Sequence, residues 1–266
     1  MNIIMNNKPD YANWVPKKLT ILLGLLSAFF AASFAASFLP ATNTLWIIVR
    51  IVLGFAVGFF LFFFVYMSYA RRLLSYDGGG VQGKALDNVL RYLDWDGKGR
   101  LLDIGCGSGA MTIKAAKKYP KAKMVGMDYW GPGWDYAKSQ CEQNARIEHV
   151  ANSITFQKGD AAHLDFADGT FDAAVSNFVF HEVKSQPDKT ALIREALRVI
   201  KPGGVFSFSD VYYSKSAYAD LDALIRDLSA DVKELHFVDT RKNDFTPRIL
   251  STPMIMGEMG LIYGRK

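Results

Sequence analysis

The stretch from Leu101 to Gly109 carries the residues of this chain that are best suited to chemistry. It reads LLDIGCGSG, an apolar run with one acid that leads into three glycines at alternate positions. Glycine has no Cβ, so its backbone can adopt positive φ and a ligand can approach it closely. Residues 110–119 are typical of a helix, and a helix start offers unpaired N–H groups. The pattern predicts a strand, a tight turn and a helix N-terminus that hold a nucleotide-like cofactor.

The glycine turn alone does not identify the cofactor. Gly105, Gly107 and Ala110 satisfy the G-x-G-x-x-G/A spacing of dinucleotide-binding turns. Asp128 follows about twenty residues later, where a carboxylate accepts hydrogen bonds from ribose hydroxyls. NAD and S-adenosylmethionine both carry such a ribose, so the turn and the acid leave both cofactors open.

Further motifs favour one of the two. Asp103 stands two residues before the first glycine, which gives D-x-G-x-G, and Gly159-Asp160-Ala161 follows the third expected strand. Three more segments come later: FADGTFD at 166–172, SNFVFHEV at 176–183 and RVIKPGG at 198–204. Over residues 100–210 the chain resembles the class I S-adenosylmethionine-dependent methyltransferases, especially type 11-like domains and the branch with the quinone-biosynthesis enzymes. This resemblance implies an α/β fold with a Rossmann-like, doubly wound, mainly parallel seven-stranded sheet.

The resemblance also implies a set of cofactor-binding residues. They are Asp103, Gly105, Cys106, Gly107, Asp128, Tyr129, Asp160, Ala161 and Asn177. Gly105 and Gly107 would pass under the methionine part of S-adenosylmethionine, with Asp103 shaping the loop. Asp128 would bind the ribose hydroxyls, and Asp160 the adenine amino group with Ala161 beside the ring. Asn177 would lie near the transferable methyl group.

The segment after Asp128 departs from the family pattern, in which a simple helix start is usual. Here it reads Tyr129-Trp130-Gly131-Pro132-Gly133-Trp134. Gly-Pro-Gly favours a rigid loop that holds aromatic side chains. Tyr129 or Trp130 could stack on the adenine or pack against the neighbouring helix, and the sequence leaves both readings open.

His181 is the expected catalytic residue, as the general base for an acceptor that must lose a proton. It lies just beyond the carboxyl end of the fourth expected strand, where ligands bind in open α/β sheets. The same position also suits a histidine that only shapes the pocket. Asp210, Tyr212 and Tyr213 follow the fifth strand and are further candidates to line the acceptor pocket. No metal site is expected, because no ligand cluster with metal-binding spacing is visible.

Two apolar runs precede this region. Residues 19–39 contain no charge, and residues 45–69 contain only Arg50. A helix needs roughly 20 apolar residues to cross a bilayer, so the runs predict a two-span hairpin that turns at 40–44. Basic pairs flank it at 17–18 and 71–72, which predicts a membrane protein with both termini and the catalytic domain on the cytoplasmic side.

The alternation of strand-like and helix-like segments after the hairpin predicts a parallel sheet with helices on both faces. The predicted domains are a membrane hairpin at 1–72, a linker with a covering helix at 73–99 and a methyltransferase domain at 100–266. The expected strands are 100–104, 123–127, 154–158, 171–177 and 205–210, with a late edge pair at 234–239 and 260–264. The expected helices are 82–92, 110–119, 134–150, 189–200 and 221–228.

Composition narrows the function further. The net charge of +5 over 266 residues is not clustered as in a nucleic-acid-binding face. The two cysteines indicate a reducing compartment. We therefore expect a membrane-anchored methyltransferase for a hydrophobic small-molecule acceptor, such as a quinone precursor, an isoprenoid or a lipid head group. A membrane-bound NAD-dependent oxidoreductase and a non-catalytic membrane scaffold are the rival readings, and the oligomeric state stays open.

Overall fold

The computed structural model describes residues 8–39, 43–131, 137–253 and 255–266. The chain forms two compact units. One unit comprises Asn13–Gln82, and the other combines Met1–Ala12 with Gly83–Lys266.

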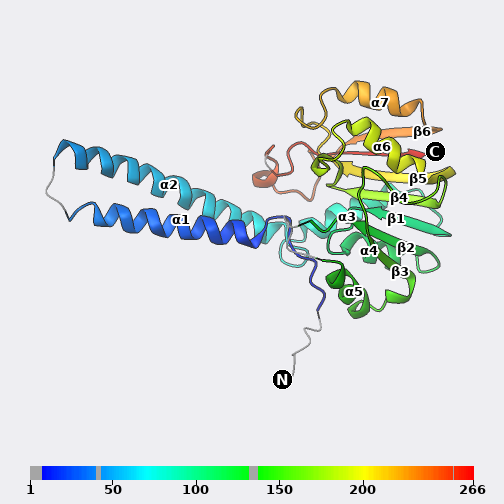
Figure 1. The fold of residues 1–266 in the computed structure, drawn as a ribbon, viewed down its shortest axis with the longest axis horizontal. Helices are drawn as coiled ribbons and strands as arrows, with labels where there is room; N and C mark the ends of the chain where they lie inside the picture. Colours follow the sequence, from blue (N-terminus) through cyan, green and yellow to red (C-terminus); the bar gives the residue numbers. More distant parts are fainter. Residues whose placement is uncertain (1–7, 40–42, 132–136, 254) are drawn as a thin grey trace, which may run out of the picture. The chain divides into compact units, whose positions relative to one another are not determined.

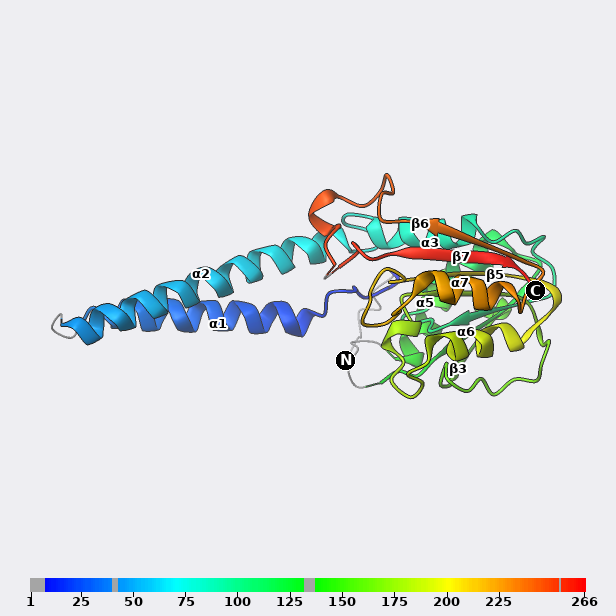
Figure 2. The same cartoon turned by 90° about the horizontal axis from the view of Figure 1, so that it is seen from above.

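The unit of residues 13–82 is a helical hairpin. It contains α1 (Lys17–Ala36) and α2 (Thr44–Leu73), which lie side by side (Figures 1 and 2). Both helices are long and apolar enough to cross a membrane. Their large apolar side chains are exposed, for example 78% of Phe55. The positions of the two predicted apolar runs are confirmed, except that α1 ends at Ala36 rather than at Leu39.

Contacts between the two helices hold the hairpin together. The rings of Phe30 and Phe60 stack with their centroids 5.0 Å apart. Arg50, the one charge within the second apolar run, donates from Nη2 to the carbonyl of Ser37 at 3.0 Å. Cations are favourable beside the unpaired carbonyls at a helix C-terminus. The guanidinium of Arg50 therefore stabilises the C-terminus of α1.

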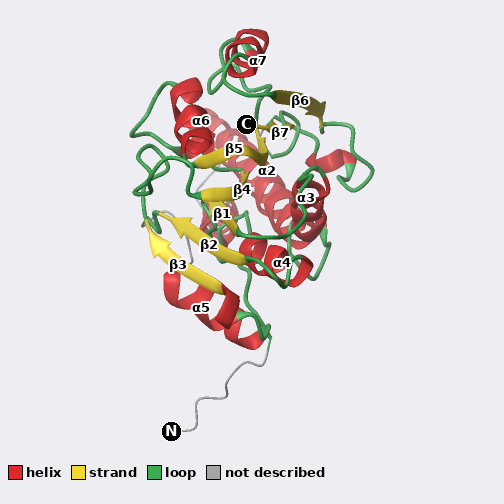
Figure 3. Ribbon diagram, turned by 90° about the vertical axis from the view of Figure 1, so that its right-hand side faces the viewer, coloured by secondary structure: helices red, strands yellow, loops and turns green. Residues whose placement is uncertain are grey.

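The other unit is built on a seven-stranded sheet in the order β3-β2-β1-β4-β5-β7-β6 (Figure 3). Its strands are β1 (Arg100–Ile104), β2 (Lys123–Asp128), β3 (Ile154–Lys158), β4 (Phe171–Asn177), β5 (Ile200–Asp210), β6 (Glu234–Asp239) and β7 (Gly260–Arg265). Strands β1 to β5 pair in parallel, whereas β7 pairs antiparallel with both β5 and β6. The predicted Rossmann-like, mainly parallel sheet with its late pair at one end is confirmed.

Helices cover both faces of this sheet. One face carries α3 (Val81–Arg91), α4 (Ala110–Lys118) and α5 (Lys138–Ile147), and the other carries α6 (Lys189–Arg198) and α7 (Leu221–Ser229) (Figure 3). The core beneath α6 and α7 contains fully buried side chains such as Phe171, Phe180 and Phe208. Burial of a large apolar side chain contributes about 1.5–3 kcal/mol, so this packing fixes the strand ends that carry polar groups.

Two predicted boundaries on either side of Val199 were wrong. The helix expected at 189–200 ends at Arg198, and the strand expected to begin at Val205 begins at Ile200. Ile200 is fully buried and pairs with Phe171, after which the pairing advances by two residues along β4 and by five along β5. The surplus residues form a bulge that accommodates Pro202.

The helix expected at 134–150 also begins later than predicted. Helix α5 starts at Lys138, after the extended residue Ala137. Residues 134–136 of that expected helix lie outside the described residues.

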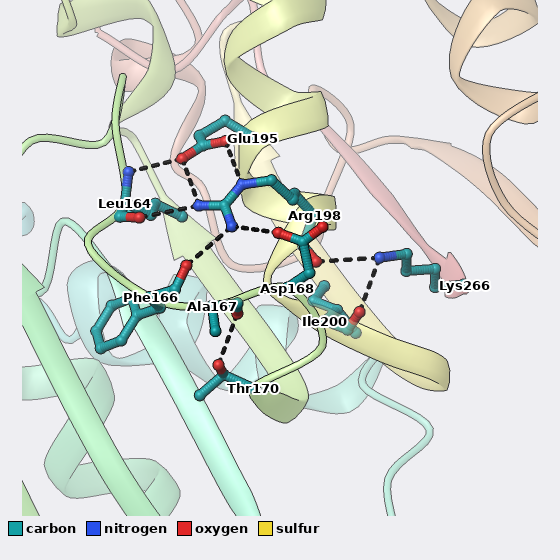
Figure 4. A network of polar contacts seen from close by, with 9 residues as sticks. All are labelled: Leu164, Phe166, Ala167, Asp168, Thr170, Glu195, Arg198, Ile200 and Lys266. Atoms are coloured by element: carbon teal, nitrogen blue, oxygen red, sulfur yellow. Dashed lines mark hydrogen bonds and ion pairs between the residues drawn. The ribbon is translucent and has the colours of Figure 1, made fainter.

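A polar network around Arg198 fixes the connection between β3 and β4 (Figure 4). The guanidinium donates to the carbonyls of Leu164 and Phe166 at 2.9 and 2.8 Å, and it pairs with the carboxylates of Glu195 and Asp168. These carboxylates raise the pKa of Arg198. The network stabilises the loop that follows Asp160.

Candidate active site

The strand register brings the predicted site residues to one edge of the sheet. Ile104 at the end of β1 pairs with Met127 on β2 and with Ser176 on β4. Asn177, the last residue of β4, pairs with Ser209 on β5. The carboxyl ends of the four strands are therefore level, and ligands bind at this edge in open α/β sheets.

The glycine loop, residues 105–109, is shaped by its backbone. The amides of Gly105 and Cys106 both donate to the carbonyl of Met127, at 2.7 and 2.9 Å. Gly105 has a φ of 73°, and a Cβ there would lie 2.2 Å from Cγ2 of Val179. Only glycine fits this backbone and this space. The loop then enters α4 at Gly109, whose φ is 82°.

Asp128 is tied directly to the glycine loop. Its Oδ2 accepts from the amide of Gly107 at 2.8 Å, and its Oδ1 accepts from the amide of Trp130 at 2.7 Å. Burial raises the pKa of Asp128 and outweighs these hydrogen bonds, which lower it. An ionised carboxylate offers about four acceptor sites, so Asp128 keeps capacity for ribose hydroxyls while it holds the loop.

The side chains of Asp103, before the loop, and Cys106, within it, are both buried. Asp103 is buried and accepts from the hydroxyl of Thr112 in the first turn of α4 at 2.6 Å. Burial raises the pKa of Asp103 to about 7. The thiol of Cys106 is also buried and has a raised pKa, mainly through burial and then through its contact with Cys141. The side chains of both residues thus support the loop from inside the domain.

The two aromatic residues after β2, Tyr129 and Trp130, make different contacts. Trp130 has a positive φ of 43°, and its indole Nε1 donates to the carbonyl of Gly107 at 2.9 Å. Tyr129 is 61% exposed, and the ammonium of Lys158 lies 5.2 Å from its ring centroid. From the sequence, each of the two residues could either stack on the adenine or pack against the neighbouring helix. The hydrogen bond from Trp130 to the glycine loop was not predicted.

Asp160 and Ala161 come shortly after the end of β3, and Asn177 is the last residue of β4. One carboxylate oxygen of Asp160 accepts from the amide of Ala162 and the hydroxyl of Ser185, and Ala161 is buried beside it. The Oδ1 atom of Asn177 is buried, and no donor among the described residues reaches it. An unpaired buried acceptor is costly, so a ligand that donates there would stabilise the site. Together with the glycine loop and Asp128, this atom fits S-adenosylmethionine, whose ribose and amino groups donate hydrogen bonds.

His181 forms a close pair with Asp210. Its Nδ1 lies 2.5 Å from Oδ1 of Asp210, and its backbone amide donates to Oδ2 at 3.1 Å. Its Nε2 lies 3.5 Å from a carboxylate oxygen of Glu182. Burial lowers the pKa of His181, but the hydrogen bonds to Asp210 and Glu182 outweigh it and raise the pKa to about 9. His181 is therefore an imidazolium at neutral pH.

Asp210 organises the part of the edge at the ends of β4 and β5. This fully buried carboxylate also accepts from the amide of Val211 at 2.7 Å and from the hydroxyl of Tyr218 at 3.1 Å. Of the other two candidates, Tyr212 is buried in the core, whereas Tyr213 lies beside the guanidinium of Arg241. Sequence reasoning missed Tyr218, because no motif marks a tyrosine that meets Asp210 through the fold.

Sequence and fold comparisons show which known proteins this chain resembles. Residues 102–208 match the family model described as a methyltransferase domain. The arsenite methyltransferase of Aquipseudomonas alcaligenes is 38% identical over 117 residues, which cover 42% of this chain and 33% of the relative. The demethylmenaquinone methyltransferase of Lactiplantibacillus plantarum is 34% identical over 104 residues, which cover 39% of this chain and 41% of the relative. The chain thus spans about a third to two fifths of the length of these curated relatives.

A solved structure agrees with the fold. The crystal structure of an S-adenosylmethionine-dependent methyltransferase from Mesorhizobium loti has a TM-score of 0.50 and 21% sequence identity. The alignment covers 70% of this chain and all of that chain. At this identity the likeness concerns the fold alone. The family match, however, coincides with the glycine loop and the level strand ends, so residues 102–208 are similar to a methyltransferase domain over this part of the chain.

Proposed function

We propose that this protein transfers a methyl group from S-adenosylmethionine to a hydrophobic small molecule held in or near a membrane. The observation that carries the proposal is the common edge of β1, β2, β4 and β5. That edge joins a glycine loop bonded to Asp128, an unpaired acceptor on Asn177 and an imidazolium held by Asp210. The first two suit the cofactor, and the third suits the acceptor.

The protein's part in this reaction is mainly to align the reacting groups. The cofactor supplies an electrophilic methyl group on a sulfonium, whose carbon–sulfur bond breaks as the acceptor's lone pair bonds to carbon and the electron pair returns to sulfur. Asp128 would bind the ribose hydroxyls, and Asp160 would bind the adenine amino group. The Oδ1 atom of Asn177 would accept a hydrogen bond from the amino acid part of the cofactor. Such alignment lowers a barrier by up to about 7–11 kcal/mol in favourable models.

His181 contributes to this proposal as a hydrogen-bond donor. At neutral pH its raised pKa keeps the proton on the ring, so the ring cannot accept the acceptor's proton. Its Nε2–H would instead orient an oxygen or an anionic group of the acceptor, while Asp210 fixes the ring from the other side. Solvent would take any proton that the acceptor releases.

The acceptor class rests on the hairpin. The relatives' names specify acceptors as different as arsenite and demethylmenaquinone, so homology alone does not select one. Two exposed apolar helices favour a membrane anchor. An anchor raises the effective concentration of the enzyme near a molecule that partitions into lipid. The basic pairs at 17–18 and 71–72 support a cytoplasmic location of the catalytic unit.

Cofactor choice is tested by titrating S-adenosylhomocysteine and NADH separately into the full chain in detergent micelles, by calorimetry. We expect binding of S-adenosylhomocysteine alone, weakened at least about tenfold in Asp128→Asn, because a carboxylate bond to a ligand contributes about 1.5–3 kcal/mol. The matched control is Asp165→Asn, which makes the same chemical change at an exposed acid that has no proposed role in binding the cofactor. Binding of NADH would favour the oxidoreductase instead, and binding of neither would favour the scaffold.

Acceptor class needs a second experiment. The full chain in phospholipid vesicles is incubated with S-adenosylmethionine labelled in its methyl group, once with demethylmenaquinone in the bilayer and once with arsenite in the buffer. We expect label in the organic extract of the first sample. Label that stays in the aqueous phase of the second sample alone would contradict a hydrophobic acceptor and leave the methyltransferase assignment intact.

A further inference from the structure

A short segment near the N-terminus belongs to the same compact unit as residues 83–266, although the 70 residues of the hairpin unit, 13–82, follow it. Residues 10–12, here called the strap, group with residues 83–266 and not with the helices. Tyr11 in the strap is only 5% exposed. Its hydroxyl donates to Oε1 of Glu148, the residue that follows α5, at 2.9 Å. The strap is therefore packed into the domain.

Asn144 on α5 forms the main seat of the strap. Its Oδ1 accepts from the amide of Asp10 at 2.8 Å, and its Nδ2 donates to the carbonyl of Asp10 at 2.7 Å. The side-chain amide of Gln140 donates to the same carbonyl at 2.6 Å. Asn144 is 1% exposed. A buried carboxamide that pairs with both polar groups of one backbone residue fixes that residue closely.

The strap also reaches the glycine loop directly. The hydroxyl of Ser108 donates to the carbonyl of Tyr11 at 2.7 Å in a buried bond. The same Nδ2 of Asn144 that binds Asp10 also donates to the carbonyl of Ser108 at 3.0 Å. Ser108 lies between Gly107, which binds Asp128, and Gly109, which begins α4. The strap, α5 and the glycine loop thus share one hydrogen-bonded network.

We propose that Asp10 and Tyr11 are positioning residues that hold the glycine loop ready for the cofactor. This inference rests on the proposed function, because it assumes that the loop binds S-adenosylmethionine. Preorganising a loop reduces the entropy lost on binding and so raises affinity. Only residues 13–16 separate the strap from α1, so the segment that seats the loop is joined through the chain to the predicted membrane anchor.

The test uses the full chain in detergent micelles and two readouts: the Kd for S-adenosylhomocysteine and hydrogen exchange of the peptide that covers residues 105–109. Tyr11→Ala removes the buried ring, and Asn144→Asp removes the two Nδ2 donations at nearly constant volume. We expect each variant to weaken binding about tenfold and to accelerate exchange in the loop but not in β4 or β5. Tyr11→Phe, which keeps the ring, should restore most of the affinity.

Asn152→Asp is the matched control, since it makes the same chemical change at an exposed position of the same unit. The proposal is overturned if Tyr11→Ala and Asn144→Asp lower thermal stability while affinity and loop exchange match the wild type. A wild-type chain that binds no S-adenosylhomocysteine overturns the proposed function instead, and with it the strap's role toward the cofactor. Should Tyr11→Ala fail to fold, Asn144→Asp and Tyr11→Phe decide the question.

Discussion

The two halves of the proposed site, a cofactor half after β1 and β2 and an acceptor half after β4 and β5, are built by different means. On the cofactor side, after β1 and β2, backbone amides and carbonyls of Gly105, Gly107 and Met127 make the decisive bonds, with Asp128 as their partner. On the acceptor side, after β4 and β5, charged side chains meet in the pair of His181 and Asp210. The first half depends on residues that lack a side chain, and the second depends on side chains from distant segments.

This difference has a physical consequence. A backbone turn is set by φ values and by the space for a Cβ, so it tolerates few substitutions, and a change of pH reaches it only through the buried acids Asp103 and Asp128. A buried ionic pair depends on protonation and on complete hydrogen bonding. The cofactor half should therefore respond most to steric changes, and the acceptor half most to changes of charge.

Gly105→Ala should have the largest effect and is confined to the cofactor half. The new Cβ would lie 2.2 Å from Val179, and alanine would adopt a φ of 73°. Overpacking costs about 1–3 kcal/mol and a left-handed residue about 1–2 kcal/mol. We expect unfolding free energy to fall by about 2–5 kcal/mol and S-adenosylhomocysteine affinity at least about a hundredfold, measured by chemical denaturation and calorimetry.

Gly203→Ala separates strain from collision. Gly203 has a similar φ of 79°, but nothing lies within 4 Å of its Cβ position. The unfolding free energy of Gly203→Ala should therefore fall only by the cost of a left-handed residue, about 1–2 kcal/mol. The affinity for S-adenosylhomocysteine should stay unchanged. Equal losses in the two variants would show that the space beside Val179 plays no part.

The same contrast explains what the sequence could reveal. Glycines at alternate positions after an apolar run predict a turn because the constraint is local, and the bounds of β1, β3 and β4 match the predicted strands. The contact of Tyr218 with Asp210 and the bonds between Asn144 and the backbone of Asp10 leave no local pattern, because each needs the finished fold. The start of β5 was missed because Pro202 and its glycines look like a turn, although burial of Ile200 decides the pairing.

The pH dependence of stability should distinguish Asp103 in the cofactor half. Its folded pKa of about 7 lies above its ordinary value of 3.8, so the folded state binds the proton more tightly. The contribution of Asp103 to the unfolding free energy is then fully present below about pH 4 and is lost as the pH rises to about 7. The loss is a few kcal/mol at most, since one pKa unit equals about 1.4 kcal/mol. Asp103→Asn should flatten this part of a denaturation series between pH 4 and 7, and an unchanged slope would contradict burial as its source.

Asp210→Asn should change the acceptor half and leave the cofactor half intact. An amide cannot accept from every donor that surrounds Asp210, so we expect unfolding free energy to fall by about 2–3 kcal/mol. The pKa of His181, raised to about 9 by Asp210 and Glu182 against burial, should fall toward 6.5 in an NMR titration of the imidazole. The stability from this pair is present below pH 6.5 and is lost as the pH rises to about 9, a window above that of Asp103. A weakened affinity for S-adenosylhomocysteine would mean that the two halves are not separate.

Tyr218→Phe should have the smallest effect and show how far the acceptor half depends on its outer partners. The hydroxyl of Tyr218 donates to Oδ2 of Asp210 at 3.1 Å, and the same oxygen still accepts from the amide of His181. Because the carboxylate keeps other donors, we expect a stability loss of about 1 kcal/mol, an unchanged cofactor affinity and a His181 pKa that stays well above 6.5. A fall of that pKa as large as in Asp210→Asn would show that the hydroxyl of Tyr218, and not the direct contact alone, maintains the bond between Asp210 and the imidazole of His181. The raised pKa of His181 would then depend on three residues together, His181, Asp210 and Tyr218, and loss of one hydroxyl would be enough to lower it.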